Sequence, residues 1–368
     1  MVSGLDYNDR LCVFLATPFP PPHGGITNWS RIVYSALRED ARIDCKIVDI
    51  SLKAEAADRG FSSNLRGLLR ILASAKKVMS DCPKDGKCVL HICTSGGKGF
   101  LRDLLLIKLA HRCSIPAVVH FHFGRIPDLL TGVSFEKKLL LSVIKHADGV
   151  ISMDRRTYIA LKACSQVGRL WLIPNPIDLR NSDCLKCKKK KQIVFVGHVN
   201  KMKGVLDLLH AWKSSASRGS GAKLKIIGPI QADLAQEVES WMEMDCVEFT
   251  GSMSHDDVMV EIASSKCLVL PSYTEGFPNV VLEAFAMGTP VVASDVGALP
   301  EMLSDDTGII VKPGDVNGIK SAIDDLYFDC DRVERIVASG KSKVSNEYSI
   351  RKVEEGLFDC WSNLALKR

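Results

Sequence analysis

The fold of this chain is decided by residues 267–294, Cys-Leu-Val-Leu-Pro-Ser-Tyr-Thr-Glu-Gly-Phe-Pro-Asn-Val-Val-Leu-Glu-Ala-Phe-Ala-Met-Gly-Thr-Pro-Val-Val-Ala-Ser. The apolar run 267–270 stops at a proline, which is typical of a buried strand in a parallel sheet. Gly276 and Pro278 lead into a helix, because glycine tolerates unusual backbone angles and proline suits a first helical position. Gly288 ends that helix, and the last residues return to the sheet. The stretch therefore predicts a strand, a loop, a helix and a second strand.

Two carboxylates in this unit indicate a ligand site. Glu275 follows the first strand, at the edge where open α/β sheets bind ligands. Glu283 lies about 7–8 Å along the helix, at 1.5 Å per residue, among apolar neighbours where a charge needs a partner. If a diphosphate rests on the helix N-terminus, which attracts anions, Glu283 is placed to bind ribose hydroxyls and Glu275 to face the transferred group. The alternative is that both are ordinary surface acids.

The segment 275–284, Glu-Gly-Phe-Pro-Asn-Val-Val-Leu-Glu-Ala, resembles the hallmark of the retaining glycosyltransferases of family 4, two glutamates separated by seven residues. A bare pair at this spacing occurs by chance, but here it lies between two predicted strands. The resemblance implies the GT-B architecture, an α/β fold of two facing Rossmann-like, doubly wound domains with an interdomain cleft. It implies a catalytic role for Glu275. The donor-binding residues that it implies in this segment are Gly276, Phe277, Asn279 and Glu283.

Length and composition support two domains. The chain has 368 residues, 46% hydrophobic and 25% charged, as expected of a globular protein large enough for two cores. Residues 1–180 are predicted to form an N-terminal, acceptor-binding Rossmann-like domain, and residues 192–347 a C-terminal, nucleotide-sugar-binding one. The polar stretch 181–191, which ends in a run of lysines, is predicted to be the linker. A final helix, 348–368, is expected to pack back on the first domain.

Two features of the first half are predicted to contact the donor. Gly24 and Gly25 follow a strand and a proline-rich turn and precede a helix, an arrangement that suits anions; they resemble the family's amino-terminal glycine loop. His120 and His122 alternate at the end of another strand and therefore share a face. A strand histidine is usually structural, but His122 matches the family's histidine beside the transferred sugar. His120 is left as a supporting or an acceptor-facing residue.

The second domain begins with a strand at 192–197 and a basic loop. Cations at the carboxyl end of this strand are placed to neutralise a diphosphate. The family commonly carries an arginine and a lysine here; Lys203 matches the lysine, and His198 occupies the arginine position. Because histidine is only partly charged at neutral pH, either Lys201 substitutes for the arginine or the diphosphate is held more loosely.

No cofactor and no metal are expected, the donor being a substrate. Asp329-Cys330-Asp331 has the carboxylate spacing of metal-dependent transferases, but it falls between predicted helices and not at a strand end. Cys184-x2-Cys187 lacks the second nearby pair that a zinc site needs. The charge that must be stabilised on a leaving diphosphate is therefore assigned to Lys203, the helix start after Gly276 and the glycine turn at 24–25.

Charge and hydropathy limit location and partners. A net charge of +5 and a pI near 8.5 are too mild to predict nucleic-acid binding. The polar start at 1–10 is not a signal peptide, and no apolar run reaches the length of a membrane span. Thirteen cysteines, among them Cys12, Cys88 and Cys267, indicate small buried hydrophobes in a reducing compartment. The protein is therefore predicted to be cytoplasmic. The basic amphipathic helix 62–79 either packs on a sheet or lies on an anionic membrane surface, and the second alternative would add peripheral contact with the cytosolic membrane face.

Together these patterns predict a retaining, metal-independent glycosyltransferase. It would move a sugar from a nucleotide-diphosphate sugar to a saccharide or a lipid-linked saccharide acceptor, and the family's habit favours bacterial surface polysaccharide or glycolipid biosynthesis. Two alternatives stay open. A nucleotide-sugar epimerase of the same fold would turn over the donor alone, and a non-catalytic partner of another transferase would bind the donor without turnover.

Overall fold

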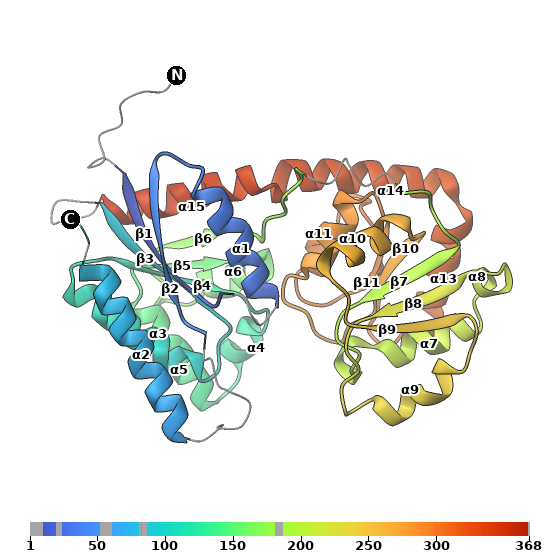
Figure 1. The fold of residues 1–368 in the computed structure, drawn as a ribbon, viewed down its shortest axis with the longest axis horizontal. Coiled ribbons are helices and arrows are strands. Elements are labelled where there is room, and N and C mark those ends of the chain that lie inside the picture. The colour runs from blue at the N-terminus through green and yellow to red at the C-terminus, as the bar shows by residue number, and fades with distance from the viewer. Residues whose placement is uncertain are drawn as a thin grey trace. The chain divides into compact units, whose positions relative to one another are not determined.

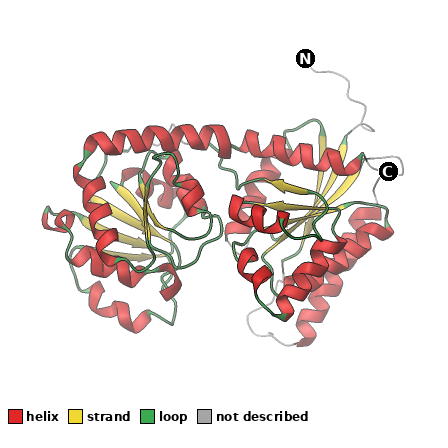
Figure 2. Cartoon of the chain, turned by 180° about the vertical axis from the view of Figure 1, so that it is seen from behind, coloured by secondary structure: helices red, strands yellow, loops and turns green. Residues whose placement is uncertain are grey.

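The chain forms two compact units in the computed structural model. One comprises Met1–Pro176 and Ile350–Arg368, and the other Ile177–Ser349. The structure describes residues 10–19, 24–51, 61–80, 82, 87–180 and 187–366, without the side chains of 61–64. The polar start at 1–9, residues 20–23 of the proline-rich turn, residues 181–186 of the predicted linker and Cys184 lie outside the described residues. Each unit encloses a sheet between helices (Figures 1 and 2).

The first unit contains a parallel six-stranded sheet in the order β2-β1-β3-β4-β5-β6. The strand order reverses between β1 and β3, which is a ligand-binding position in doubly wound sheets. The elements of this unit are β1 (Leu11–Thr17), α1 (Gly25–Leu37), β2 (Ile43–Asp49), α2 (Phe61–Ser80), β3 (Cys88–Thr94), α3 (Gly99–Arg112), β4 (Ala117–Phe121), α4 (Ile126–Thr131), α5 (Phe135–His146), β5 (Gly149–Ser152), α6 (Arg155–Lys162), β6 (Leu170–Leu172) and α15 (Ile350–Ala365).

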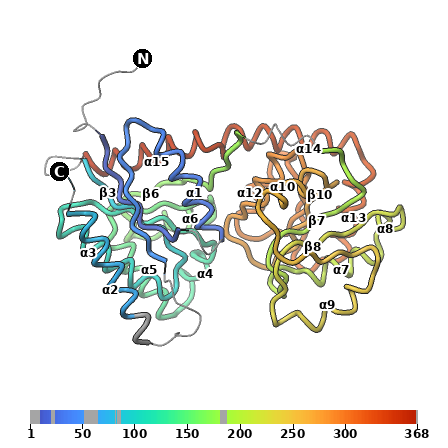
Figure 3. The backbone as a smooth tube through the Cα atoms, viewed as in Figure 1, coloured from blue at the N-terminus to red at the C-terminus, as the bar shows by residue number. Residues whose placement is uncertain are grey.

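The two faces of this sheet carry separate cores, because successive residues of a strand point to opposite faces. On one face Phe14 of β1 belongs to the cluster that contains Ile71 of α2. On the other face Leu15 belongs to the cluster that contains Trp29 of α1 and Trp361 of α15. The last helix, red in Figure 3, therefore completes the core of the unit that contains the start of the chain.

The second unit contains another parallel six-stranded sheet, in the order β12-β11-β10-β7-β8-β9. Its strand order reverses between β7 and β10. The elements are β7 (Gln192–Val196), the 3-10 turn η3 (Lys201–Lys203), α7 (Val205–Lys213), α8 (Ala216–Gly219), β8 (Lys223–Ile227), α9 (Ala235–Met242), β9 (Val247–Gly251), α10 (His255–Ser264), β10 (Cys267–Leu270), α11 (Asn279–Ala286), β11 (Val291–Ser294), α12 (Leu299–Met302), β12 (Ile309–Val311), α13 (Val316–Phe328), α14 (Cys330–Lys343) and the π-helical turn η4 (Val344–Tyr348).

Helix α2 packs on the sheet through its second half. Ile71, Ala75 and Met79 are buried in the core, as the packing alternative predicts. Leu65 and Leu69 in the first half are 49% and 57% exposed. Contact of this half with a membrane surface stays a prediction. Among the helices that the structure describes, none combines the length and the apolar composition needed to cross a bilayer.

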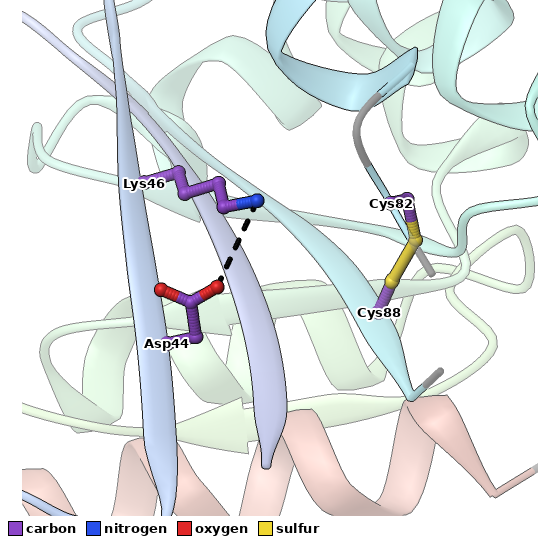
Figure 4. The surroundings of a disulfide bond; sticks show 4 residues. All are labelled: Asp44, Lys46, Cys82 and Cys88. Atoms are coloured by element: carbon purple, nitrogen blue, oxygen red, sulfur yellow. Dashed lines mark ion pairs between the residues drawn. A yellow bond between two sulfur atoms is a disulfide. The ribbon is translucent and has the colours of Figure 1, made fainter. Parts of the chain in front are cut away.

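The expectation that the cysteines are unpaired hydrophobes is wrong for Cys88. Cys82, just past the end of α2, forms a disulfide with Cys88 at the start of β3 (Figure 4). The two residues are six positions apart along the chain. Cys12 and Cys267 are free and buried, as predicted. Structural disulfides persist in oxidising compartments. Thiol titration of freshly isolated protein measures whether Cys82 and Cys88 are paired, and a stable pair would argue against the predicted reducing compartment.

Candidate functional site

The loops after β7 and β10 meet where the strand order of the second sheet reverses. Gly204 ends η3 with φ of +65°, and a Cβ on this residue would lie 2.0 Å from the carbonyl oxygen of Pro271. The backbone N–H of Tyr273 donates to the carbonyl oxygen of Met202 over 2.9 Å, and the Tyr273 hydroxyl donates to Asp207 over 2.8 Å. These contacts join the two loops into one support.

Replacing Gly204 by alanine is expected to separate these loops. The left-handed backbone alone costs about 1–2 kcal/mol for a residue with a Cβ, and the clash with Pro271 adds to it. Gly221→Ala is the matched control, because Gly221 has φ of +83° but nothing within 4 Å of the added atom. Urea unfolding should show a larger decrease in the free energy of unfolding for Gly204→Ala than for Gly221→Ala. Equal losses would mean that the contact with Pro271 is not a constraint.

Glu275, the predicted catalytic residue, is held by two donors on this support. Lys203 Nζ lies 2.6 Å from Glu275 Oε1, and the hydroxyl of Ser272 donates to the same oxygen over 2.7 Å. The side chain of Glu275 is only 7% exposed, and that of Lys203 is 26% exposed. A charge-assisted pair with little solvent is stronger than one in water, so the carboxylate is fixed in one orientation. The sequence pattern singled out both charged residues but missed Ser272.

The segment from Gly276 to Asn279 connects this carboxylate to α11. Pro278 is extended, with ψ of 114°, and is the N-cap, so the helix begins one residue after it. The carbonyl oxygen of Gly276 accepts from the backbone N–H of Ala298 over 3.0 Å. The ring of Phe277 packs edge-on against Tyr348, inside the second unit. The first turn of α11 contains no acidic residue, which leaves its positive end suited to an anion.

Glu283 lies on α11 with its side chain 12% exposed. Its Oε1 is 3.9 Å from Nδ1 of His255, at the start of α10, whose side chain is 49% exposed. This spacing is too long for a hydrogen bond. Because only 12% of its side chain is exposed, Glu283 is a mostly buried carboxylate and not the ordinary surface acid of the alternative interpretation.

The cations of the loop after β7 are not equivalent. Lys201 forms an ion pair of 2.8 Å with Glu237 of α9, so its charge is already matched on the protein. Whether Lys201 substitutes for the missing arginine stays a prediction. His198 is exposed, and its Nδ1 lies 3.0 Å from the side-chain nitrogen of Gln231. Gln231 has no local sequence signal, because this contact joins loops 33 positions apart.

In the first unit, the glycine turn precedes α1. Gly24 is the N-cap, and its carbonyl oxygen accepts from the backbone N–H of Asn28 over 2.9 Å and from the Thr27 hydroxyl over 3.0 Å. A Cβ on Gly25 would meet nothing within 4 Å. The first turn has no acidic residue. Among the described residues no side chain caps this helix start, the arrangement that suits a phosphate.

Three histidines and two tryptophans fill the face of the first sheet beneath α1 and α15. His120 and His122 lie on the same side, with ring centroids 4.1 Å apart, as predicted, and Trp29 packs against both. Burial lowers the pKa of His122 and of His91 to about 3, so these rings are neutral at neutral pH. His120 is fully buried. This burial favours a supporting role beside His122 over contact with an acceptor.

One group of these residues has the composition of a metal site. His91, Cys93 and His120 have ligand atoms within 4.8 Å of one another. However, the indole N–H of Trp361 donates to Nδ1 of His91 over 3.0 Å. The hydrogen of a neutral ring is then on Nε2, and His91 has no lone pair left for a metal.

The carboxylate pair at 329 and 331 lies at the start of α14, as the sequence indicated. The Asp329 carboxylate accepts from the backbone N–H of Arg332 and caps this helix, which is a structural role.

Similarity to solved structures covers nearly the whole chain. Sucrose-phosphate synthase from Thermosynechococcus elongatus aligns with a TM-score of 0.75 over 96% of this chain and 99% of that one, at 17% identity. HepE from Anabaena, in complex with UDP, aligns with a TM-score of 0.72 over 96% and 100%, at 15% identity. The chain has the GT-B fold. At these identities the GT-B likeness establishes architecture and not activity.

Sequence comparison finds a family match in the second unit. Residues 190–329 match the family model described as glycosyl transferases group 1. A capsular polysaccharide biosynthesis glycosyltransferase, CapM of Staphylococcus aureus, is 29% identical over 167 residues, 45% of this chain and 44% of that protein. An uncharacterized 41.2 kDa protein in the cps region of Klebsiella pneumoniae is 27% identical over 70% of this chain and 75% of its own length. The match to CapM thus spans less than half of that relative.

Proposed function

We propose that this protein is a retaining glycosyltransferase that uses a nucleotide-diphosphate sugar. The observation that carries the proposal is the Lys203–Glu275 pair, held at the strand-order reversal of the unit that matches the group 1 transferases. Open α/β sheets bind ligands at this position, and a cation beside a buried carboxylate suits a donor with both a diphosphate and a reacting sugar. CapM is a glycosyltransferase, and HepE was solved in complex with UDP, which agrees with a nucleotide-sugar donor.

Each residue has a defined role in the proposed reaction. The bond between the anomeric carbon and the diphosphate oxygen breaks, and its electron pair leaves with the diphosphate. Lys203 and the N–H groups at the start of α11 stabilise that charge. Glu275 stabilises the positive character of the sugar, and Glu283 binds the ribose. The acceptor oxygen forms the new bond on the face that the diphosphate leaves, its proton passes to a phosphate oxygen, and configuration is retained.

In the first unit, the proposal gives His122 a role in binding the sugar or its phosphate, and Gly24 and Gly25 a role beside the donor phosphates. A neutral His122 suits hydroxyl recognition, because one ring nitrogen donates and the other accepts. The acceptor is proposed to be a saccharide or a lipid-linked saccharide in surface polysaccharide or glycolipid biosynthesis, a setting suggested by the relatives from Staphylococcus aureus and Klebsiella pneumoniae. Contact with the cytosolic membrane face stays part of the proposal.

The test is an incubation of protein with UDP-, GDP- and ADP-sugars, with and without a panel of saccharide and lipid-linked acceptors, followed by product analysis. Transfer that needs the acceptor, keeps the anomeric configuration and survives excess chelator is the expected result. Conversion of the donor alone to an epimer would favour the epimerase, and binding without turnover would favour the non-catalytic partner. Strict dependence on added divalent metal would contradict the assignment of the leaving charge to Lys203 and main-chain N–H groups.

A further inference from the structure

The loops after β7 and β8 are joined through their backbones. The N–H of Val199 donates to the carbonyl oxygen of Pro229 over 3.0 Å, and the N–H of Gln231 donates to the carbonyl oxygen of Val199 over 3.0 Å. The side chains of Gln231, Asn200 and His198 are therefore held next to one another by main-chain contacts, although the first comes from a different loop. The same stretch continues into η3, which carries Lys203.

The side chains form a hydrogen-bonded relay whose direction is set by the backbone. The N–H of Lys203 donates to Oδ1 of Asn200 over 3.0 Å, so the other end of this amide is its NH2 group. That group donates to Oε1 of Gln231 over 2.9 Å, which places the NH2 group of Gln231 3.0 Å from Nδ1 of His198. If the Asn200 amide were reversed, its NH2 group would face the backbone N–H of Lys203, and neither group can accept. If the Gln231 amide alone were reversed, its NH2 group would face the NH2 group of Asn200.

The relay determines which nitrogen of His198 carries the hydrogen. An amide NH2 group only donates, so Nδ1 must present its lone pair, and the hydrogen lies on Nε2. Protonation of the ring would place a second N–H against the Gln231 amide. The charged groups around this loop have partners on the protein: Lys201 pairs with Glu237, Lys203 with Glu275, and Asp233 accepts from the backbone N–H of Lys201 over 3.2 Å.

We propose that His198 binds the donor diphosphate as a neutral N–H donor through Nε2, and that Gln231 and Asn200 are positioning residues that hold it in this form. The inference rests on the proposed function, because it assigns a diphosphate to this loop. It also resolves the question raised by the missing arginine: the position supplies a fixed hydrogen bond in place of a charge. Nucleotide binding should therefore not require His198 to take up a proton.

Gln231→Glu reverses the last step of the relay. A carboxylate at this position only accepts, so Nδ1 must carry a hydrogen and Nε2 becomes a lone pair that repels phosphate unless the ring is protonated. Gln236→Glu is the matched control, because it makes the same change on the exposed face of α9, near in sequence but outside the relay. The probes are UDP, GDP and ADP, with affinities measured by calorimetry between pH 7 and 9.

For the nucleotide that binds, the dissociation constant of the unmodified protein and of Gln236→Glu should change by less than about twofold over this range. That of Gln231→Glu should rise by up to about tenfold per pH unit, because binding then takes up one proton. A flat profile for Gln231→Glu, or a steep one for the unmodified protein, would overturn the inference.

Nitrogen-15 NMR of histidine-labelled protein without nucleotide separates this inference from the proposed function. The His198 signals, assigned through their loss in His198→Gln, should show hydrogen on Nε2 in the unmodified protein at pH 8 and on Nδ1 in Gln231→Glu. Hydrogen on Nδ1 in the unmodified protein would overturn the relay whatever binds. If the expected form is seen but none of the three nucleotides binds any of these proteins, the role of His198 at a diphosphate and the proposed donor class fail together, and only the positioning by Gln231 stands.

Discussion

Glu275→Gln should abolish sugar transfer while leaving the nucleotide bound. Glutamine has the same shape and keeps an oxygen that can accept from Lys203 and Ser272, so the two loops stay joined. What it removes is the negative charge that stabilises the sugar as its bond to the diphosphate breaks. Loss of one such preorganised electrostatic group typically costs about 10²–10³ in turnover rate. We expect a fall of at least this size, with nucleotide affinity changed by less than about threefold.

The control for this experiment is Glu239→Gln, the same chemical change on the exposed surface of α9. It should leave turnover and affinity unaltered. Steady-state kinetics with an acceptor found in the panel incubation, together with calorimetric titration of the nucleoside diphosphate, measures both quantities. Full activity in Glu275→Gln would refute the catalytic assignment, and loss of nucleotide binding with preserved thermal stability would assign Glu275 to the donor's diphosphate side.

Trp361→Ala should strongly destabilise the first unit. Trp361 is fully buried, belongs to the core that joins α15 to β1 and α1, and donates its indole N–H to His91. Truncating a buried tryptophan typically costs about 3–5 kcal/mol through lost burial and the cavity left behind. The His91 nitrogen would also lose its donor in a buried setting. Urea unfolding monitored by circular dichroism should show an earlier transition for this unit.

Trp361→Phe separates the contribution of the buried ring from that of the hydrogen bond to His91. It keeps an aromatic ring in the core but removes the N–H, so the expected loss is smaller, about 1–3 kcal/mol. Trp212→Phe is the comparison in the second unit, where the indole nitrogen has no hydrogen-bond partner among the described residues. A loss below about 1 kcal/mol for Trp361→Ala would show that α15 contributes little to this core.

Local patterns predicted the elements around the site well. The stretch 267–294 forms β10, α11 and β11, because the apolar runs, the glycines and the prolines act on neighbouring residues. The period of two along the strand placed His120 and His122 on one side for the same reason. The error at Cys88 has a related cause: a cysteine in a buried strand has the same sequence pattern whether or not a partner reaches it from an adjoining helix.

The sequence alone determined the class of fold, the strand that precedes each candidate loop and the acids and cations that those loops carry, because these depend on periodicity and on residues close together in the chain. Only the tertiary structure decided which side chains meet. Lys203 reaches Glu275 across 72 positions and Gln231 reaches His198 across 33, since parallel strands carry distant loops to one edge of a sheet. It also decided the burial that keeps His91 and His122 neutral, which depends on packing from α1 and α15 and has no local signature.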